Sequence, residues 1–402
     1  TAANAVPRTG TAGFGLDAFG FVSAPGKEPR EFQGHGQFSV DFAAAVFSAH
    51  AYLTEYSLVS DDSVSGGGIE LTAAGGLSKI DGSFTGNALY QGWFGSAAGR
   101  LNARFYGPAA EELGGSFAGS NADGMSVAGS FTGQRDASVE PENLTLTNLT
   151  RAQYFYTQFG NGLVGGLNRQ NSETFVYGAP TSDLLGGQFT INDKTASENA
   201  NFVAYRKTFG SGASAQDVRL ELYRPGAANT ELALTYASFG HWATVLNEGA
   251  GPRPVEQYFA YGLETPARLL SAKTGTGRYQ GVVYGSGANA STGASYAVKG
   301  TSRFDVDFSA QSYSGALTMA GTPTGGGAGV DFGSFDFAGP LSRYLAETTV
   351  ELTRAGQPVG QLETRFFGPD GEEIAGPFSL FISQGVPGAS LNIRGVAAAK
   401  RQ

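Results

Sequence analysis

The chain carries the same set of motifs twice, in the same order. The repeated pairs are Thr9–Phe14 with Thr274–Tyr279, Phe38–Phe42 with Phe304–Phe308, and Arg104–Pro108 with Arg365–Pro369. The offsets between the partners are 265, 266 and 261 residues. Three collinear matches at nearly one offset indicate an internal duplication, and a duplicated chain must fold as two copies of one unit.

Each copy shows the alternation that is typical of β-strands. Phe38, Val40 and Phe42 fall on one face of an extended segment and the polar residues between them fall on the other. The 61 glycines among 402 residues are spread along the chain, and the 29 Phe and 17 Tyr favour strands. Glycines allow the bends and bulges by which a sheet closes on itself. We therefore predict an all-β protein in which each copy is a small antiparallel barrel of about eight strands.

The segment between the two copies has a different character. Residues 136–150 are polar and contain a proline, so we interpret them as a linker. Residues 151–265 contain short runs that are typical of strands, separated by turn pairs such as Pro225–Gly226. The predicted organisation is a first barrel at 1–135, a linker at 136–150, a β-rich domain at 151–265 that is more open than the barrels, and a second barrel at 266–402.

Composition excludes several classes of function. The chain has no Cys, so a disulfide framework, a thiolate metal site and a Cys nucleophile are all excluded. Its net charge is −9 and its basic residues do not cluster, which argues against nucleic-acid binding. No apolar run reaches the roughly 18 residues of a membrane-spanning helix.

Two stretches resemble a known family. Arg104–Gly115 (RFYGPAAEELGG) resembles the barrel signature of transferrin-binding protein B and related bacterial surface lipoproteins. The run Leu234–Trp242, followed by Tyr261–Gly262, Thr265–Ala267 and Thr274–Thr276, is similar to the passage from handle domain into barrel in that group.

The resemblance implies a function that the residues alone do not show. It implies a lipoprotein, exposed at the bacterial outer membrane, that captures a ligand or partner and passes a nutrient to a TonB-dependent transporter. The captured species would be a protein, an iron source or another nutrient. The acylated Cys that anchors such proteins is absent from this chain, so membrane attachment would depend on a lipid anchor outside it.

The order of domains in this chain differs from that of the family it resembles. A handle domain precedes each barrel in the family, whereas Thr9–Thr11 begins the first barrel almost at residue 1. We therefore expect the first handle to be missing, which argues against transferrin as the ligand.

The residues that could support catalysis or cofactor binding are few. We find no complete Gly-x-Ser-x-Gly motif, so we predict a protein that is not an enzyme and needs no cofactor. The duplicated pairs Glu111–Glu112 and Glu372–Glu373 are interpreted as structural residues on an exposed turn that caps each barrel. His35, His50 and His241 are the only histidines, and haem ligation by one of them is a weaker alternative.

The candidate binding residues are aromatic and basic side chains of the first copy. Tyr90, Trp93 and Phe94 place three large rings between Gly-rich stretches, where they could anchor a partner. Lys27 and Arg30 belong to a second candidate loop at 24–30. The first function predicted is capture at the outer membrane. A secreted or surface carrier of haem or another small ligand, and an adhesive structural surface protein, are the alternatives.

Overall fold

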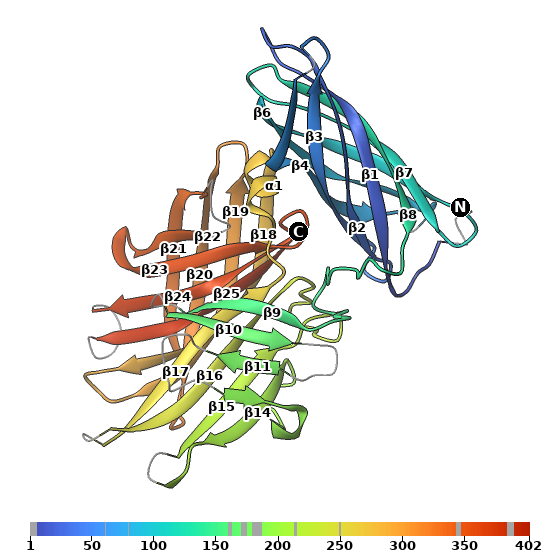
Figure 1. Ribbon diagram of the computed structural model, residues 1–402. Helices are drawn as coiled ribbons and strands as arrows, with labels where there is room; N and C mark the ends of the chain where they lie inside the picture. The colour runs from blue at the N-terminus through green and yellow to red at the C-terminus, as the bar shows by residue number, and fades with distance from the viewer. Residues whose placement is uncertain are drawn as a thin grey trace. The chain divides into compact units, whose positions relative to one another are not determined.

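The chain folds into two barrels and one open sheet, as a computed structural model shows (Figure 1). The structure describes residues 6–60, 62–78, 80–159, 163–169, 175–178, 187–212, 215–248, 251–342, 347–383 and 390–402. Within these residues, two closed antiparallel barrels of eight strands each flank a sheet of nine strands. The predicted all-β class, with its two barrels, is confirmed.

The first barrel is a simple up-and-down meander in which each strand pairs with the next and β8 closes on β1. It consists of β1 (Thr11–Ser23), β2 (Arg30–Asp41), β3 (Val46–Ser57), β4 (Ser63–Leu77), β5 (Ser83–Gly92), β6 (Gly95–Tyr106), β7 (Glu112–Ser120) and β8 (Ser126–Arg135).

The interior of the first barrel is filled by aromatic rings. Phe38 and Val40 point inward as their alternation predicts, and the Phe38 ring stacks on the Phe47 ring at 5.2 Å between centroids. The Phe84 and Phe105 rings pack at 4.9 Å beside them. Ring pairs at these spacings leave the barrel a packed core rather than a lumen.

The middle segment forms the nine-stranded sheet, in the order β12-β11-β10-β9-β17-β16-β15-β14-β13. Its strands are β9 (Gln153–Phe159), β10 (Leu163–Arg169), β11 (Phe175–Gly178), β12 (Gly187–Phe189), β13 (Lys194–Thr195), β14 (Phe202–Phe209), β15 (Gln216–Tyr223), β16 (Ala237–Glu248) and β17 (Gly251–Gly262), with a 3-10 turn η1 (Ile191–Asp193).

The second barrel repeats the topology of the first. It consists of β18 (Thr276–Asn289), β19 (Ser295–Asp307), β20 (Ser312–Pro323), β21 (Val330–Pro340), β22 (Glu347–Arg354), β23 (Gln357–Phe367), β24 (Glu373–Ile382) and β25 (Leu391–Arg401). The sheet strands β16 and β17 lie against the outside of β24 and β25 (Figure 1). One outer face of this barrel is therefore covered.

The chain divides into two compact units that do not follow the sequence order. One unit is Thr1–Asn148 with Pro266–Lys273, and the other is Leu149–Thr265 with Thr274–Gln402. Of the predicted linker 136–150, residues 136–148 pack within the first unit, where Thr145 Oγ1 and Asn148 Nδ2 donate to the buried carboxylate of Asp41. No helix among the residues described is long and apolar enough to cross a membrane.

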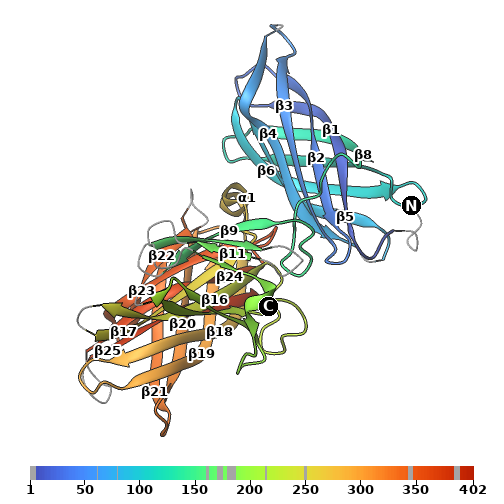
Figure 2. The ribbon, with the colours of Figure 1, turned by 60° about the horizontal axis from the view of Figure 1, so that its bottom comes forward.

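The short helix α1 (Ala267–Ala272), labelled in Figure 2, packs on the outside of the first barrel, although it precedes the second barrel in sequence. Leu269 is buried there against Ala74 and Leu89. These are outward-facing positions of β4 and β5, and the helix shields them from water. Arg268 forms an ion pair with Glu70 beside this contact.

We expect Leu269→Ser to release α1 from the first barrel, because a polar side chain loses most of the apolar contact that holds so short a helix. Trypsin should then cleave after Arg268 and Lys273 several times faster than in the parent chain. Ser271→Ala, which changes an exposed residue of the same helix, is the matched control. Equal cleavage rates for the parent and Leu269→Ser would mean that this contact does not hold the helix.

Candidate functional site

One end of the first barrel gathers most of the predicted binding residues. Because the strands run alternately up and down, the β1–β2, β3–β4, β5–β6 and β7–β8 connections meet at the same end. We call these four connections the barrel rim. The segment 24–29, with Lys27, and the pair Trp93–Phe94 both belong to it.

Trp93 is the large exposed side chain of the β5–β6 turn. Its side chain is 64% exposed, while Phe94 is partly buried and packs against the barrel core. Gly95 closes this turn at φ 115°, a conformation in which other residues are strained. The Trp93 backbone N–H donates to Glu55 Oε1 at 2.9 Å, so the turn is tied to the inside of the barrel.

Glu55 is the hub beneath this turn. Its side chain is fully buried, accepts a hydrogen bond from the Tyr90 hydroxyl at 2.6 Å and lies 3.2 Å from Arg30 Nε. A Cβ at Gly92 would come within 2.2 Å of Glu55 Oε1, so a larger residue there would displace the carboxylate. Burial, followed by the hydrogen bond to Glu55, raises the pKa of the Tyr90 hydroxyl well above its usual range.

The structure corrects the predicted position of two binding residues. Tyr90 and Arg30 were expected on exposed loops, but both are buried inside the barrel. Tyr90 belongs to β5, in which alternate side chains point inward. Ala88 points inward, so Tyr90, two residues later, points inward as well. Arg30 is the first residue of β2 and points toward Glu55. Lys27 is exposed in the β1–β2 turn.

Sequence reasoning missed Glu55, although a signal was present. Along β3 the buried positions alternate through Ala49, Ala51 and Leu53 to Glu55. A carboxylate at the next inward position of an apolar strand needs buried partners, because an isolated buried charge is very unfavourable. The inward Arg30 and Tyr90 are those partners.

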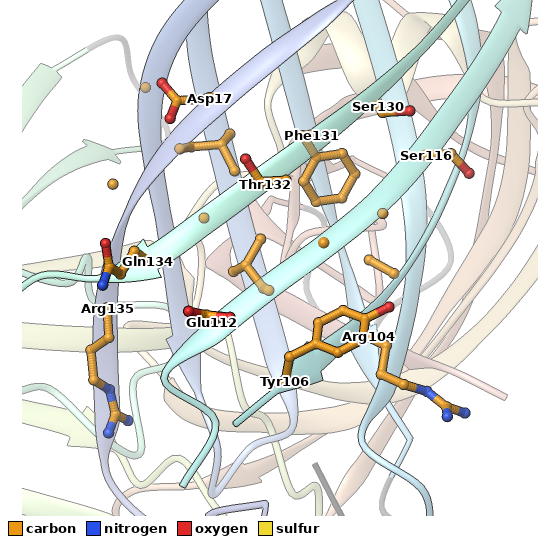
Figure 3. Close-up of a pocket in the computed structure, with 18 of the residues that line it drawn as sticks. Asp17, Arg104, Tyr106, Glu112, Ser116, Ser130, Phe131, Thr132, Gln134 and Arg135 are labelled. Atoms are coloured by element: carbon orange, nitrogen blue, oxygen red, sulfur yellow. The ribbon is translucent and has the colours of Figure 1, made fainter. Parts of the chain in front are cut away.

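A second feature of the first barrel is a trough on its outer face, over β6, β7, β8 and β1 (Figure 3). Its volume is about 1520 Å³. The two central strands, β7 and β8, present small outward residues, which are Gly114, Ser116, Ser130 and Thr132. The flanking strands, β6 and β1, present larger ones, which are Arg104, Tyr106, Asp17 and Phe19. Small residues between large ones hollow the surface. We call the residues of these two sets, together with Glu112 and Gln134, the outer trough.

In the duplicated carboxylate pairs, the first Glu makes the same contact in both copies, whereas the second differs in burial. Glu111 and Glu372 act alike, since each accepts the backbone N–H two residues before it, at 2.8 and 2.9 Å. Glu112 is exposed at the edge of the outer trough, as Figure 3 shows. Glu373 is fully buried, so the prediction that both pairs lie on an exposed turn is wrong for this residue.

The buried carboxylate of Glu373 holds the sheet against the second barrel. It accepts hydrogen bonds from the backbone N–H groups of Thr235, Tyr236 and Ala237 at 2.7, 2.9 and 2.8 Å. Burial raises the pKa of Glu373, and the three N–H donors and the Lys400 ammonium oppose that rise. The covering segment Thr235–Ala237, which lies more than 130 residues before Glu373 in sequence, accounts for the burial.

The histidines do not form a site with other ligand residues. Among the residues that the structure describes, no group of three or more His, Cys, Asp or Glu could hold a metal ion. His35 pairs with Asp17 on the outside of the first barrel and His50 pairs with Glu70. His241 stacks on Tyr258 at 4.3 Å within the nine-stranded sheet.

Comparison with known proteins identifies both barrels. Residues 7–135 and 272–401 match the family model described as the C-lobe and N-lobe beta barrels of Tf-binding protein B. No curated protein matches the chain in a sequence search.

Several solved structures are similar to the chain. The isotype 1 transferrin-binding protein B of serogroup B Neisseria meningitidis is 17% identical, with a TM-score of 0.35 over 99% of this chain and 77% of that one. A double mutant of transferrin-binding protein B from Haemophilus parasuis is 16% identical, with a TM-score of 0.36 over 100% and 78%. The N-lobe domain of the lactoferrin-binding protein B of Moraxella bovis is 12% identical, with a TM-score of 0.27 over 63% and 100%.

Proposed function

The chain belongs to the family of the C-lobe and N-lobe barrels of transferrin-binding protein B, and from this we propose that it is a non-enzymatic surface protein that captures a ligand. We propose further that it sits at the outer membrane of its bacterium through a lipid anchor. There it would assist a TonB-dependent transporter in the uptake of a nutrient, such as the iron of a captured protein.

The observation that carries this proposal is the construction of the barrel rim. Trp93 is exposed, and its backbone is fixed from below by the buried carboxylate of Glu55. A large aromatic side chain on an immobilised backbone loses little freedom on binding, and such residues anchor protein interfaces. We assign Trp93, Phe94 and Lys27 to contact with the partner, and Tyr90 and Arg30 to positioning the turn through Glu55.

Protein capture fits the first barrel better than the carriage of a small ligand. The interior is occupied by packed rings, such as Phe38 on Phe47, and a small-ligand carrier of this architecture needs an open cavity there. Binding at the rim uses the surface instead, and it leaves the core intact.

The proposed function predicts that the chain, immobilised and incubated with solubilised outer membranes of its own organism, retains one TonB-dependent transporter. Mass spectrometry identifies the retained protein, and the transporter's substrate becomes the ligand to test. Retention of no transporter by the folded chain would contradict the proposed partnership. In that event, haem titration and binding to host cells would test the carrier and adhesive alternatives.

The rim assignment predicts that Trp93→Ala weakens the retained complex by about tenfold or more, as truncation of an interface anchor does. The matched control is Ile80→Ala, which removes an 82% exposed apolar side chain from the opposite end of the same barrel. Affinity is measured by surface plasmon resonance with the captured partner. If Trp93→Ala and Ile80→Ala bind alike, the rim is not the contact surface, although the capture function can still stand.

A further inference from the structure

The outer trough of the first barrel is the duplicate of the face that the nine-stranded sheet covers on the second barrel. The strand pairs correspond one to one, because Glu112 pairs with Gln134 across β7 and β8 as Glu373 pairs with Lys400 across β24 and β25. In the same way, Phe19 on β1 occupies the position of Tyr284 on β18.

On the second barrel this face forms the interface with the nine-stranded sheet. Glu373 receives the three backbone N–H groups of Thr235–Ala237, and Lys400 Nζ donates to the Ala233 carbonyl at 2.9 Å. Tyr284 is the aromatic centre of the contact. Its ring lies 5.1, 6.1 and 5.7 Å from three sheet rings, which are Phe202, Tyr223 and Phe239.

On the first barrel the same two positions keep their chemistry and are exposed among the residues that the structure describes. Glu112 is an exposed carboxylate that has no hydrogen-bond or ion-pair partner in the described part of the chain. Phe19 is 54% exposed. Gln134, in the place of Lys400, still offers an N–H donor for a carbonyl next to Glu112. The two groups that matter most for docking on the second barrel are therefore present and open on the first.

The outward residues between these two positions, which form the floor of the trough, differ between the two barrels. This difference indicates the kind of contact that each face makes. On the second barrel the outward residues are apolar and buried, namely Ala375, Pro377, Val396, Ala398 and Val282. Their counterparts in the outer trough are Gly114, Ser116, Ser130, Thr132 and Asp17. A permanently docked apolar sheet would desolvate these hydroxyls and the Asp17 carboxylate, at a cost that polar groups repay only when they are hydrogen-bonded. A polar floor suits a hydrated, reversible contact.

We propose that the outer trough binds an extended segment of a partner protein, and that this segment presents consecutive free backbone N–H groups to Glu112 and an aromatic side chain to Phe19. The segment would lie over β7 and β8 as residues 233–237 lie over β24 and β25. Recognition of backbone N–H groups by one carboxylate selects a chain conformation more than a sequence. This surface is distinct from the barrel rim, so the inference stands independently of the proposed function.

The probe that tests this inference is a synthetic peptide with the sequence of residues Thr230–Gly240, the segment that Glu373 holds on the second barrel. The peptide carries a fluorophore at its N-terminus and is titrated with the full chain while its anisotropy is measured. We expect saturable binding that Glu112→Ala and Phe19→Ala each weaken by about tenfold, since a charge-assisted hydrogen bond or a buried ring contact is worth that much. A peptide N-methylated at the residues that correspond to Tyr236 and Ala237 should bind as weakly.

The control protein is Glu351→Gln, which changes an exposed carboxylate on β22 of the second barrel and should bind the peptide as the parent does. Circular dichroism checks that each variant is folded. The inference is overturned if the parent chain does not bind the peptide. It is equally overturned if binding survives both Glu112→Ala and N-methylation, or if binding depends on Glu373 instead of Glu112.

Discussion

Replacing Glu373 by alanine is expected to lower the free energy of unfolding of the second unit by about 3–5 kcal/mol, because it leaves three backbone N–H groups without an acceptor, two of them buried and that of Thr235 half-buried. Each of these donors loses a charge-assisted hydrogen bond, and the sheet that covers them keeps water out. The loss is therefore much greater than that caused by removing an exposed carboxylate.

The duplication supplies the matched control for this prediction. Glu112→Ala removes the same side chain from the same motif on the first barrel, where it is exposed, and should change stability by no more than about 0.5 kcal/mol. The chain has two tryptophans, and Trp242 alone lies in the second unit. Guanidinium denaturation followed by Trp242 emission in a Trp93→Phe background therefore reports on that unit. Equal effects of the two substitutions would mean that the N–H contacts of Glu373 do not stabilise the sheet.

The raised pKa of Glu373 adds a dependence on pH. A carboxyl group whose pKa is higher in the folded chain than its usual 4.5 binds its proton more tightly when folded. Its contribution to stability is then fully present below the unfolded value and declines as the pH rises through the folded value. The melting temperature of the parent relative to Glu373→Gln should therefore increase as the pH is lowered toward 4.5.

The second large effect is expected at Glu55, inside the first barrel. Glu55→Ala should cost about 3–5 kcal/mol, because it removes the buried partner of the Arg30 guanidinium and the acceptor of Tyr90 and Trp93. Hydrogen exchange of peptides from β3 and β5, read by mass spectrometry, measures the loss of protection in this unit.

A double substitution separates the charge from the packing at this hub. Arg30→Met with Glu55→Leu removes both charges and keeps apolar volume, so it should recover most of the stability that Glu55→Ala loses. The Trp93 turn would still lack its acceptor, and acrylamide should quench Trp93 emission differently from the parent. A double variant as unstable as Glu55→Ala would show that the ion pair is not the source of the effect.

The fold could be predicted from the sequence because two of its signals are local. The alternation of Phe38, Val40 and Phe42, repeated at Phe304, Val306 and Phe308, specifies an inward face, and all six side chains are buried. The duplicated motifs then specify that the two sheets share one topology, as they do. Both signals are carried by short runs of neighbouring residues, so they can be recognised without knowledge of the tertiary structure.

The candidate site could be predicted only in part, because burial is not local. Tyr90 and Trp93 stand three residues apart in one aromatic run, yet the strand ends between them, so one ring is buried and the other is exposed. Glu112 and Glu373 share a motif almost residue for residue. Their opposite exposures depend on whether a distant sheet covers the barrel, and the motif that they share does not encode that.

The distance along the chain between Thr235–Ala237 and the carboxylate of Glu373, 136 to 138 residues, also has a consequence for synthesis on the ribosome. The first barrel can close as soon as β8 has emerged. The nine-stranded sheet, by contrast, emerges before the strands that cover it. The rings of Tyr223 and Phe239 therefore remain uncovered until β18 and β24 have been synthesised. At usual elongation rates this wait lasts on the order of 10 s. During that interval the nascent chain exposes an apolar sheet, which makes it a natural substrate for holding chaperones. A fragment that stops before β24 should accordingly be recovered as aggregate, whereas the first barrel alone has no such interval.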